Sequence, residues 1–280
     1  MSSITNTSND TATTSVTDTL RTTVTDTLKT TINEAGIATV TLTRADKHNA
    51  FDDAIISGLT STFKRLESDP QVKLMILASE GESFSAGGDL NWMRRMASFS
   101  HEENLADAQG LANMLYSLDR FSKPTIARVQ GAAFGGAVGL VSCCDIAVGT
   151  QHAKFCLSEV KVGLVPATIS PYVIAAIGQR AARRFFLTAE VINAQSALEL
   201  GLLSSLVAPD QLDVEIERFC QALLSNGPQA MQGAKSLIFE IASAPLSEEL
   251  IAHTSSVIAK ARVSAEGQER LANFLNRHKK

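Results

Sequence analysis

The chain of 280 residues is 45% hydrophobic and 19% charged, which is typical of a folded globular protein with a large buried core. Its formal net charge of −4 excludes a general electrostatic attraction to nucleic acid or to an anionic membrane. No apolar stretch approaches the roughly 20 uncharged residues that a membrane-spanning helix requires.

Residues 1–24 are rich in Ser, Thr, Asn and Asp, so we expect them to form a disordered leader. They lack the apolar run of a signal peptide, and their acidic residues argue against a transit peptide. A near-repeat, VTDTLRTT at 16–23 and VTDTLKTT at 24–31, crosses the end of this leader. We expect the second copy to begin the first strand.

An α/β domain is predicted over residues 25–205. Apolar residues alternate around a turn at Asn33–Gly36, which indicates a hairpin, and a continuous apolar run at 72–78 indicates a strand buried on both faces. Helical spacing follows the hairpin and recurs over about 102–120. The alternation predicts ββα units with parallel strands. The further short strands are expected within 123–131, 145–150 and 153–160.

Residues 206–280 are predicted to form a helical region for trimerisation or capping. Its helices are expected over 211–224, 228–243 and 247–276. No Pro/Gly-rich linker precedes them, so we expect them to dock on the core or on a neighbouring subunit.

The segment VQGAAFGGAVGLVSCCD, residues 129–145, holds four glycines within nine residues. It matches neither GxxxxGK[ST] nor GxGxxG, so both nucleotide-binding loops are excluded. A glycine-rich turn at the start of a helix instead exposes backbone amides that can stabilise an oxyanion. A second such turn, ESFSAGGDLNWM, lies at 82–93, and two amides from separate turns suit a thioester enolate. Ordinary tight turns would explain the glycines alone.

Several motifs in one order carry a more specific resemblance. The sequences TLTRADKHNAFD, SFSAGGDL, VQGAAFGGAVGLVSCCDIAV and AKFCLSEVKVGLVP resemble the enoyl-CoA hydratase/isomerase (crotonase) superfamily over about residues 28–280. The resemblance implies a crotonase-like ββα superhelix core with a helical C-terminal region. It also implies chemistry on an acyl-CoA thioester and a homotrimer or a dimer of trimers.

The family pattern implies roles for particular residues. The oxyanion-hole amides fall on Gly88 and Gly136, and Glu159 falls on the glutamate that moves a proton at Cα. Apolar neighbours should raise the pKa of Glu159, although a lone glutamate at a strand end is often a surface group. Lys47 is the nearest cation for the CoA phosphates, or else a solvated loop lysine. The residues expected to border CoA are Lys47, Ala50, Ala86 and Leu90.

Gly139 departs from the pattern of typical hydratases, which carry a second glutamate at this position. Two carboxylates can hold a water between them, whereas a single carboxylate suits the transfer of a proton from carbon to carbon. The leading interpretation remains a lyase that hydrates an α,β-unsaturated acyl-CoA, since some single-glutamate members also hydrate. The alternative is a Δ3,Δ2-enoyl-CoA isomerase.

Residues 167–171, ATISP, replace the glycine-rich turn that is usual in the family. Together with AFGGAVGLVSCCDIAVG at 133–149, they resemble the bacterial methylglutaconyl-CoA and isohexenylglutaconyl-CoA hydratases of leucine and acyclic-terpene breakdown. The resemblance implies a branched or carboxylated substrate such as 3-methylglutaconyl-CoA. Thr168 or Ser170 would anchor the water or the distal carboxylate. Alternatively, these hydroxyls cap the helix that begins near Pro171.

No further partner or cofactor is predicted. The segment 101–123 has one Arg and one Lys and a larger number of acidic residues, which argues against an RNA-binding stripe. The cysteines form no CxxC pair and the histidines are dispersed, so neither a metal nor a redox cofactor is expected, and CoA is part of the substrate. Buried reduced thiols favour a cytoplasmic location.

Overall fold

The computed structural model describes residues 19–277, and two sheets form the centre of the molecule. In the larger sheet the first two pairings are antiparallel and the others are parallel. Its strands, in spatial order, are β1 (Thr19–Val24), β2 (Leu28–Asn33), β3 (Ile37–Leu42), β4 (Leu74–Ser79), β5 (Thr125–Val129), β7 (Ile146–Thr150) and β10 (Ser205–Val207). The smaller sheet consists of β6 (Ala132–Phe134), β8 (Lys154–Cys156) and β9 (Ile192–Asn193).

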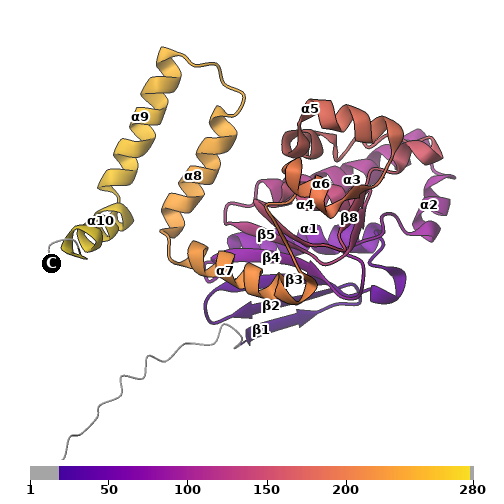
Figure 1. The fold of residues 1–280 in the computed structure, drawn as a ribbon, viewed down its shortest axis with the longest axis horizontal. Coiled ribbons are helices and arrows are strands. Elements are labelled where there is room, and N and C mark those ends of the chain that lie inside the picture. Colours follow the sequence, from indigo (N-terminus) through magenta and orange to yellow (C-terminus); the bar gives the residue numbers. More distant parts are fainter. Residues whose placement is uncertain (1–18, 278–280) are drawn as a thin grey trace, which may run out of the picture.

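Helices cover one face of the larger sheet (Figure 1). In α1, Ile55, Leu59 and Phe63 are buried, as their helical spacing predicts. The predicted α/β core with parallel strands is therefore confirmed. The helices of this layer are α1 (Asp53–Ser68), α2 (Leu90–Met96), α3 (His101–Asp119), α4 (Gly136–Cys143), α5 (Ser170–Thr188) and α6 (Ala194–Glu199). Short 3-10 turns are η1 (Ala45–Lys47), η2 (Glu159–Val162) and η3 (Pro209–Gln211).

Strand β4 shows why its sequence is apolar throughout. All six of its residues are buried, and alternate side chains point to opposite faces of the sheet. Met75 and Leu77 join the core beneath α1 and α3. Leu74 and Ile76 instead pack with residues of α7 (Leu212–Leu224) on the other face.

Helix α7 packs on the core, as expected for C-terminal helices that dock there, and the boundary at 205/206 stays a prediction. Its buried residues Leu212, Ile216 and Cys220 pack against the sheet. Helical periodicity reveals an apolar stripe but not the surface that the stripe covers. The helical extension therefore begins with α8 (Pro228–Ile241).

The expected leader extends too far. Thr19–Val24 forms β1, which pairs with β2, so each copy of the near-repeat supplies one strand. An ion pair of 2.6 Å between Arg21 and Asp69 ties this edge strand to the core. Backbone pairing thus orders a segment whose composition favours disorder. Residues 1–18 of the expected leader lie outside the described part of the chain.

The single helix expected over 247–276 is two helices, α9 (Glu248–Val263) and α10 (Ala265–Arg277). Ser264 adopts an extended conformation, and its hydroxyl accepts a hydrogen bond from the Gly267 amide at 3.0 Å. A serine that caps a new helix interrupts the periodic pattern.

Helices α8, α9 and α10 extend away from the α/β core (Figure 1). None of the three contains a buried residue. Their exposed large apolar side chains include Ile238, Ile251, Ile258, Val263 and Leu271. Among the residues that the structure describes, no helix is long and apolar enough to cross a membrane.

Candidate active site

Three extended segments lie side by side and end at the same edge. Ser85 forms a parallel bridge with Ala133, and Ala133 is the parallel partner of Phe155 in the β6–β8 pair. Because parallel segments have their carboxyl ends at one edge, the residues that follow also meet there. The turns that follow these segments carry Gly88, Gly136 and Glu159.

The Gly136 amide is the first of α4, where an amide has no partner within the helix. The preceding Gly135 has φ 53° and ψ −122°, a backbone conformation in which a residue with a side chain would be strained. The Gly135 amide donates a hydrogen bond to the Cys156 carbonyl at 2.8 Å. A Cβ atom at residue 135 would lie 3.5 Å from Oε1 of Glu159. The Glu159 carboxylate is therefore beside the Gly136 turn.

Two backbone hydrogen bonds to Phe51 hold the Gly88 turn. The Phe51 amide donates to the Gly87 carbonyl at 2.7 Å, and the Asp89 amide donates to the Phe51 carbonyl at 2.7 Å. Within residues 19–277, neither the Gly88 nor the Gly136 amide donates to a protein acceptor. Gly88 is exposed and Gly136 is partly exposed, so both N–H groups are available to a ligand.

Phe51 also contacts the second turn, a role that the sequence did not reveal. A Cβ atom at residue 136 would lie 3.4 Å from Cδ2 of the Phe51 ring. Phe51 thus bonds to the Gly88 turn through its backbone, and its ring lies beside the Gly136 turn. Its only signal in the sequence is an apolar residue just before a helix, which indicates burial rather than a role in a site.

Glu159 is the first residue of η2 and follows the end of β8 by three positions, and the Leu164 amide donates to its carbonyl at 3.0 Å. Oε2 of its side chain is buried without a hydrogen-bond partner among the described residues. Burial raises the pKa of the Glu159 carboxyl, and a hydrogen bond from its own backbone amide partly opposes this shift. A carboxyl group of this kind suits both the uptake and the release of a proton.

The four residues expected to border CoA lie on two neighbouring segments, one from η1 to Ala50 and one from Ala86 to the start of α2. The Ala86 amide donates to the His48 carbonyl at 2.9 Å, which joins the loop of Lys47 and Ala50 to the loop of Ala86 and Leu90. Lys47, Ala86 and Leu90 are exposed, and Ala50 is partly buried. The structure thus brings all four to the side of Gly88.

The space beside Gly139 is filled. A Cβ atom at this position would lie 2.5 Å from Cγ2 of Ile169 and 3.2 Å from Cδ2 of Leu115. Both neighbours are fully buried. The position where typical hydratases carry a second glutamate is therefore closed by apolar side chains from α3 and the start of α5.

The hydroxyls of Thr168 and Ser170, at the start of α5, differ in their contacts. The Ser170 hydroxyl donates to the Ala167 carbonyl at 2.8 Å. The N-cap residue of α5 is Ile169, and no side chain caps its amides, so the expected capping by Thr168 or Ser170 is wrong. The partly buried Thr168 hydroxyl has no hydrogen-bond partner within residues 19–277.

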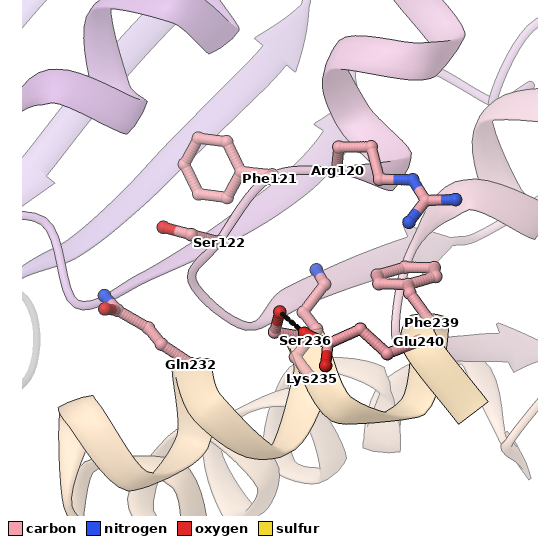
Figure 2. A pocket seen from close by; sticks show the side chains of 8 residues that line it. All are labelled: Arg120, Phe121, Ser122, Gln232, Lys235, Ser236, Phe239 and Glu240. Carbon is pink, nitrogen blue, oxygen red and sulfur yellow. Dashed lines mark hydrogen bonds between the residues drawn. The ribbon is translucent and has the colours of Figure 1, made fainter. Parts of the chain in front are cut away.

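A pocket of about 260 Å³ lies elsewhere, between the end of α3 and α8 (Figure 2). Phe121 and Ser122, which line this pocket, come just before β5, whereas the Gly136 turn comes after that strand. The pocket and the candidate site therefore lie at opposite ends of β5. The cations of the pocket are already paired, with Lys235 2.8 Å from Asp145 and Arg120 3.0 Å from Asp119. This pocket therefore belongs to the junction between α8 and the core.

Metal ligands do not gather in the part of the chain that the structure describes: it contains no group of three or more His, Cys, Asp or Glu residues placed to hold an ion. The four cysteines are free, three of them buried and Cys144 partly buried.

The chain is similar to known proteins over most of its length. The family model described as enoyl-CoA hydratase/isomerase matches residues 32–280. A crystal structure of an enoyl-CoA hydratase from Shewanella pealeana is 49% identical, with a TM-score of 0.87, and the match covers 89% of this chain and 93% of that chain. An enoyl-CoA hydratase of Alternaria alternata is 34% identical over 73% of this chain and 67% of its own length. A trans-2-decenoyl-[acyl-carrier-protein] isomerase of Streptococcus mutans is 27% identical over 73% of this chain and 79% of its own length.

Proposed function

Because the chain belongs to the enoyl-CoA hydratase/isomerase family, we propose that it adds water across the α,β double bond of an enoyl-CoA thioester. The observation that carries this proposal is Oε2 of Glu159, which is buried without a hydrogen-bond partner among the described residues and lies beside the Gly136 turn, at the edge that also carries the available amide of Gly88. The fold expected from the sequence, a crotonase fold with a helical C-terminal region, is confirmed.

The reaction requires one acid–base group. The amides of Gly88 and Gly136 donate hydrogen bonds to the thioester oxygen, which makes Cβ electrophilic. The Glu159 carboxylate takes a proton from water while the water oxygen bonds to Cβ, and the electron pair moves to the thioester oxygen as an enolate. Glu159 then returns the proton to Cα, and the product carries OH at Cβ and H at Cα.

CoA enters as part of the substrate, and no separate cofactor takes part in the proposed reaction. Lys47 is available to the CoA phosphates because its side chain is exposed. Ala50, Ala86 and Leu90 offer small or apolar contacts to the pantetheine chain along the same edge.

We propose a branched or carboxylated acyl group, with 3-methylglutaconyl-CoA as the leading substrate. The resemblance of residues 133–149 and 167–171 to the bacterial methylglutaconyl-CoA hydratases supports this substrate. The unpartnered Thr168 hydroxyl, next to Ile169, would hold the distal carboxylate or the attacking water. Unchanged kinetics of a Thr168→Ala, Ser170→Ala variant would remove this assignment.

A Δ3,Δ2-enoyl-CoA isomerase is the second candidate. It is favoured by the absence of a carboxylate at Gly139 and by the similarity to the isomerase of Streptococcus mutans. In this reaction Glu159 would take a proton from Cα and return it to Cγ, with the same two amides stabilising the dienolate.

We further propose a cytoplasmic homotrimer or dimer of trimers. The exposed apolar residues of α8, α9 and α10 support an assembly that buries them. Charged substitutions at Ile258 and Leu271 should reduce the mass measured by light scattering. An unchanged mass would remove this assignment of the surface.

The proposed reaction is tested with purified protein on three substrates: 3-methylglutaconyl-CoA, crotonyl-CoA and a 3-enoyl-CoA. Hydration yields a 3-hydroxyacyl-CoA that is heavier by one water, whereas isomerisation yields a conjugated product of unchanged mass. We expect a hydrated product from 3-methylglutaconyl-CoA. Conversion of the 3-enoyl-CoA alone would replace the proposal with the isomerase.

A further inference from the structure

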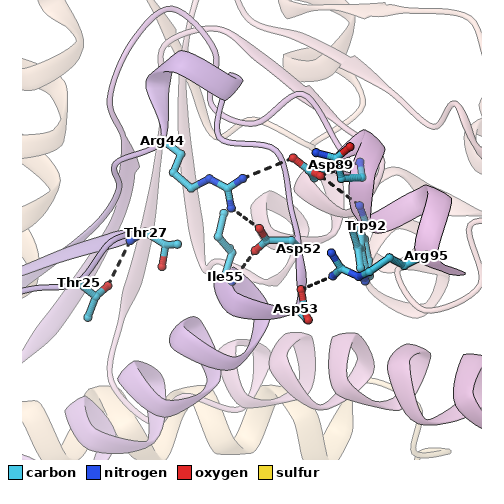
Figure 3. Close-up of polar contacts among 10 residues, drawn as sticks. Thr25, Thr27, Arg44, Asp52, Asp53, Ile55, Asp89, Trp92 and Arg95 are labelled. Carbon is cyan, nitrogen blue, oxygen red and sulfur yellow. Dashed lines mark hydrogen bonds and ion pairs between the residues drawn. The ribbon is translucent and has the colours of Figure 1, made fainter.

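Arg44 lies between the two loops that hold Phe51 and Gly88. Its guanidinium group pairs with Asp52 through Nη1 and with Asp89 through Nη2, the second at 3.5 Å (Figure 3). Asp52 directly follows Phe51, and Asp89 directly follows Gly88. Arg44 therefore links, through its side chain, the same two backbone segments that the Phe51–Gly88 bridge joins.

Each carboxylate is itself fixed by a helix. Asp52 caps α1 by accepting a hydrogen bond from the Ile55 amide at 3.0 Å. Asp89 caps α2 by accepting hydrogen bonds from the Asn91 amide at 2.8 Å and the Trp92 amide at 3.1 Å. Because caps restrain both carboxylates, the shared guanidinium restrains the distance between the starts of the two helices.

The arrangement is shielded from water. The side chains of Arg44, Asp52 and Asp89 are 12%, 18% and 13% exposed. A hydrogen bond from the Trp92 amide contributes most to lowering the pKa of Asp89, and the charges of Lys47 and Arg44 lower it further, so the carboxylate is ionised at neutral pH. A neighbouring pair, Arg95 and Asp53, also joins α2 to α1, but its side chains are 50% and 69% exposed. Exposed pairs of this kind contribute little to stability.

We propose that Arg44 is a positioning residue for the oxyanion hole, an inference that rests on the function proposed above. By holding Asp52 and Asp89 together, Arg44 keeps the segment of Gly88 paired with the backbone of Phe51 and so fixes the position of the Gly88 amide. The Phe51 ring contacts the Gly136 turn, so the same arrangement sets the separation of the two amide donors. Loss of Arg44 leaves both amides in the protein but misaligns them with the thioester oxygen.

Arg44→Met tests the proposal, with Arg95→Met as the matched control on the exposed pair. We expect kcat to fall about 10- to 100-fold in Arg44→Met with KM little changed, because amide alignment matters most in the transition state. Arg44→Lys, which keeps the charge but cannot form the two-sided fork, should lie between Arg44→Met and wild type. Arg95→Met should behave as wild type.

An infrared measurement separates alignment from a general loss of structure. The probe is butyryl-CoA labelled with 13C at the thioester carbonyl, which hydration cannot consume. Two hydrogen bonds should lower the carbonyl stretching frequency in the wild-type complex, and Arg44→Met should show a smaller shift while Arg95→Met retains the full shift. An equal shift in all three proteins would overturn the role of Arg44.

Asp89→Asn keeps the inference testable if Arg44→Met fails to fold. Its side-chain oxygen can still cap α2 at the Asn91 and Trp92 amides, but the charge facing Arg44 is lost. We expect the same direction of change in kcat and in the carbonyl shift. Unchanged values in a folded Asp89→Asn would contradict the inference. Absence of any hydrated or isomerised product in wild type would instead defeat the proposed function.

Discussion

The candidate site and the C-terminal helices differ in how their side chains are supported. The candidate site uses three parallel segments whose turns are held by backbone hydrogen bonds and by buried residues such as Phe51. Helices α8, α9 and α10 bury no residue and present apolar side chains to solvent. The proposed catalytic groups are therefore held within one packed core, whereas α8, α9 and α10 leave an apolar surface uncovered. The same kind of substitution should therefore change turnover and stability differently in the core and in α8.

Removal of a carboxylate should produce the largest difference. We expect Glu159→Gln to lower kcat about 10³-fold, because general acid–base catalysis contributes about 10²- to 10⁴-fold. Glu240→Gln is the control on α8, where the carboxylate accepts a hydrogen bond from Ser236 at 2.7 Å and lies 2.6 Å from His253. Steady-state kinetics should show wild-type turnover for this control. Equal losses in both variants would contradict the contrast.

Glycine-to-alanine changes compare the packing of the two regions. A Cβ atom at Gly131 would overlap the carbonyl oxygen of Glu82, on the loop that leads to Gly88. Gly131→Ala should therefore cost about 1–3 kcal/mol of unfolding free energy. Gly233, in α8, has open space around it, and alanine should stabilise the helix there by about 1 kcal/mol. Urea unfolding monitored by circular dichroism measures both, and similar values would refute the comparison.

A double-mutant cycle examines the filled space beside Gly139. Gly139→Ala should be destabilising because its Cβ would lie 2.5 Å from Cγ2 of Ile169. Ile169→Ala removes that obstacle while leaving a cavity of its own. The two changes together should cost about 1 kcal/mol less than the sum of the single changes, as measured by urea unfolding. Additive losses of unfolding free energy would mean that Ile169 does not restrict the space for a side chain at position 139.

The smallest expected effect is on stability as a function of pH, where removal of a buried and of an exposed carboxylate should shift the melting temperature in opposite directions. Burial raises the pKa of Glu159, so its contribution to stability is complete below the unfolded pKa of about 4.3 and is lost as pH rises through the folded pKa. Hydrogen bonds from Ser236 and His253 lower the pKa of Glu240, so its contribution is present above the unfolded pKa and is lost at acid pH. At neutral pH, Glu159→Gln should raise the melting temperature and Glu240→Gln should lower it. Shifts of the same sign would contradict this assignment.

Local patterns predicted much of the core. The helical spacing in α1 and the unbroken apolar run of β4 reflect the surfaces that these elements bury. The same patterns predicted the helix α7 but not the face of the sheet that it covers. They also missed the break at Ser264, because periodicity specifies neither the packing partner of an apolar stripe nor the start of a new cap. They also missed β1, whose order comes from pairing with β2 rather than from its own composition.

The candidate site was only partly accessible from the sequence. The motifs around Gly88, Gly136 and Glu159 could be recognised, and the structure places them at one edge of adjacent segments. The roles inferred for Arg44 and Ile169 depend on the contact of Arg44 with Asp89, 45 positions away, and on the closeness of Ile169 to Gly139, about 30 positions away. Such contacts arise from tertiary packing, so no local spacing could predict them.

The central claim is that the single carboxylate of Glu159 moves the proton during hydration. The most direct measurement follows deuterium at Cα when wild type and Glu159→Gln act on 3-methylglutaconyl-CoA in D2O. We expect the wild-type 3-hydroxy product to carry one deuterium at Cα, and the variant to incorporate it about 10³-fold more slowly. Undiminished incorporation by Glu159→Gln would show that another group transfers the proton.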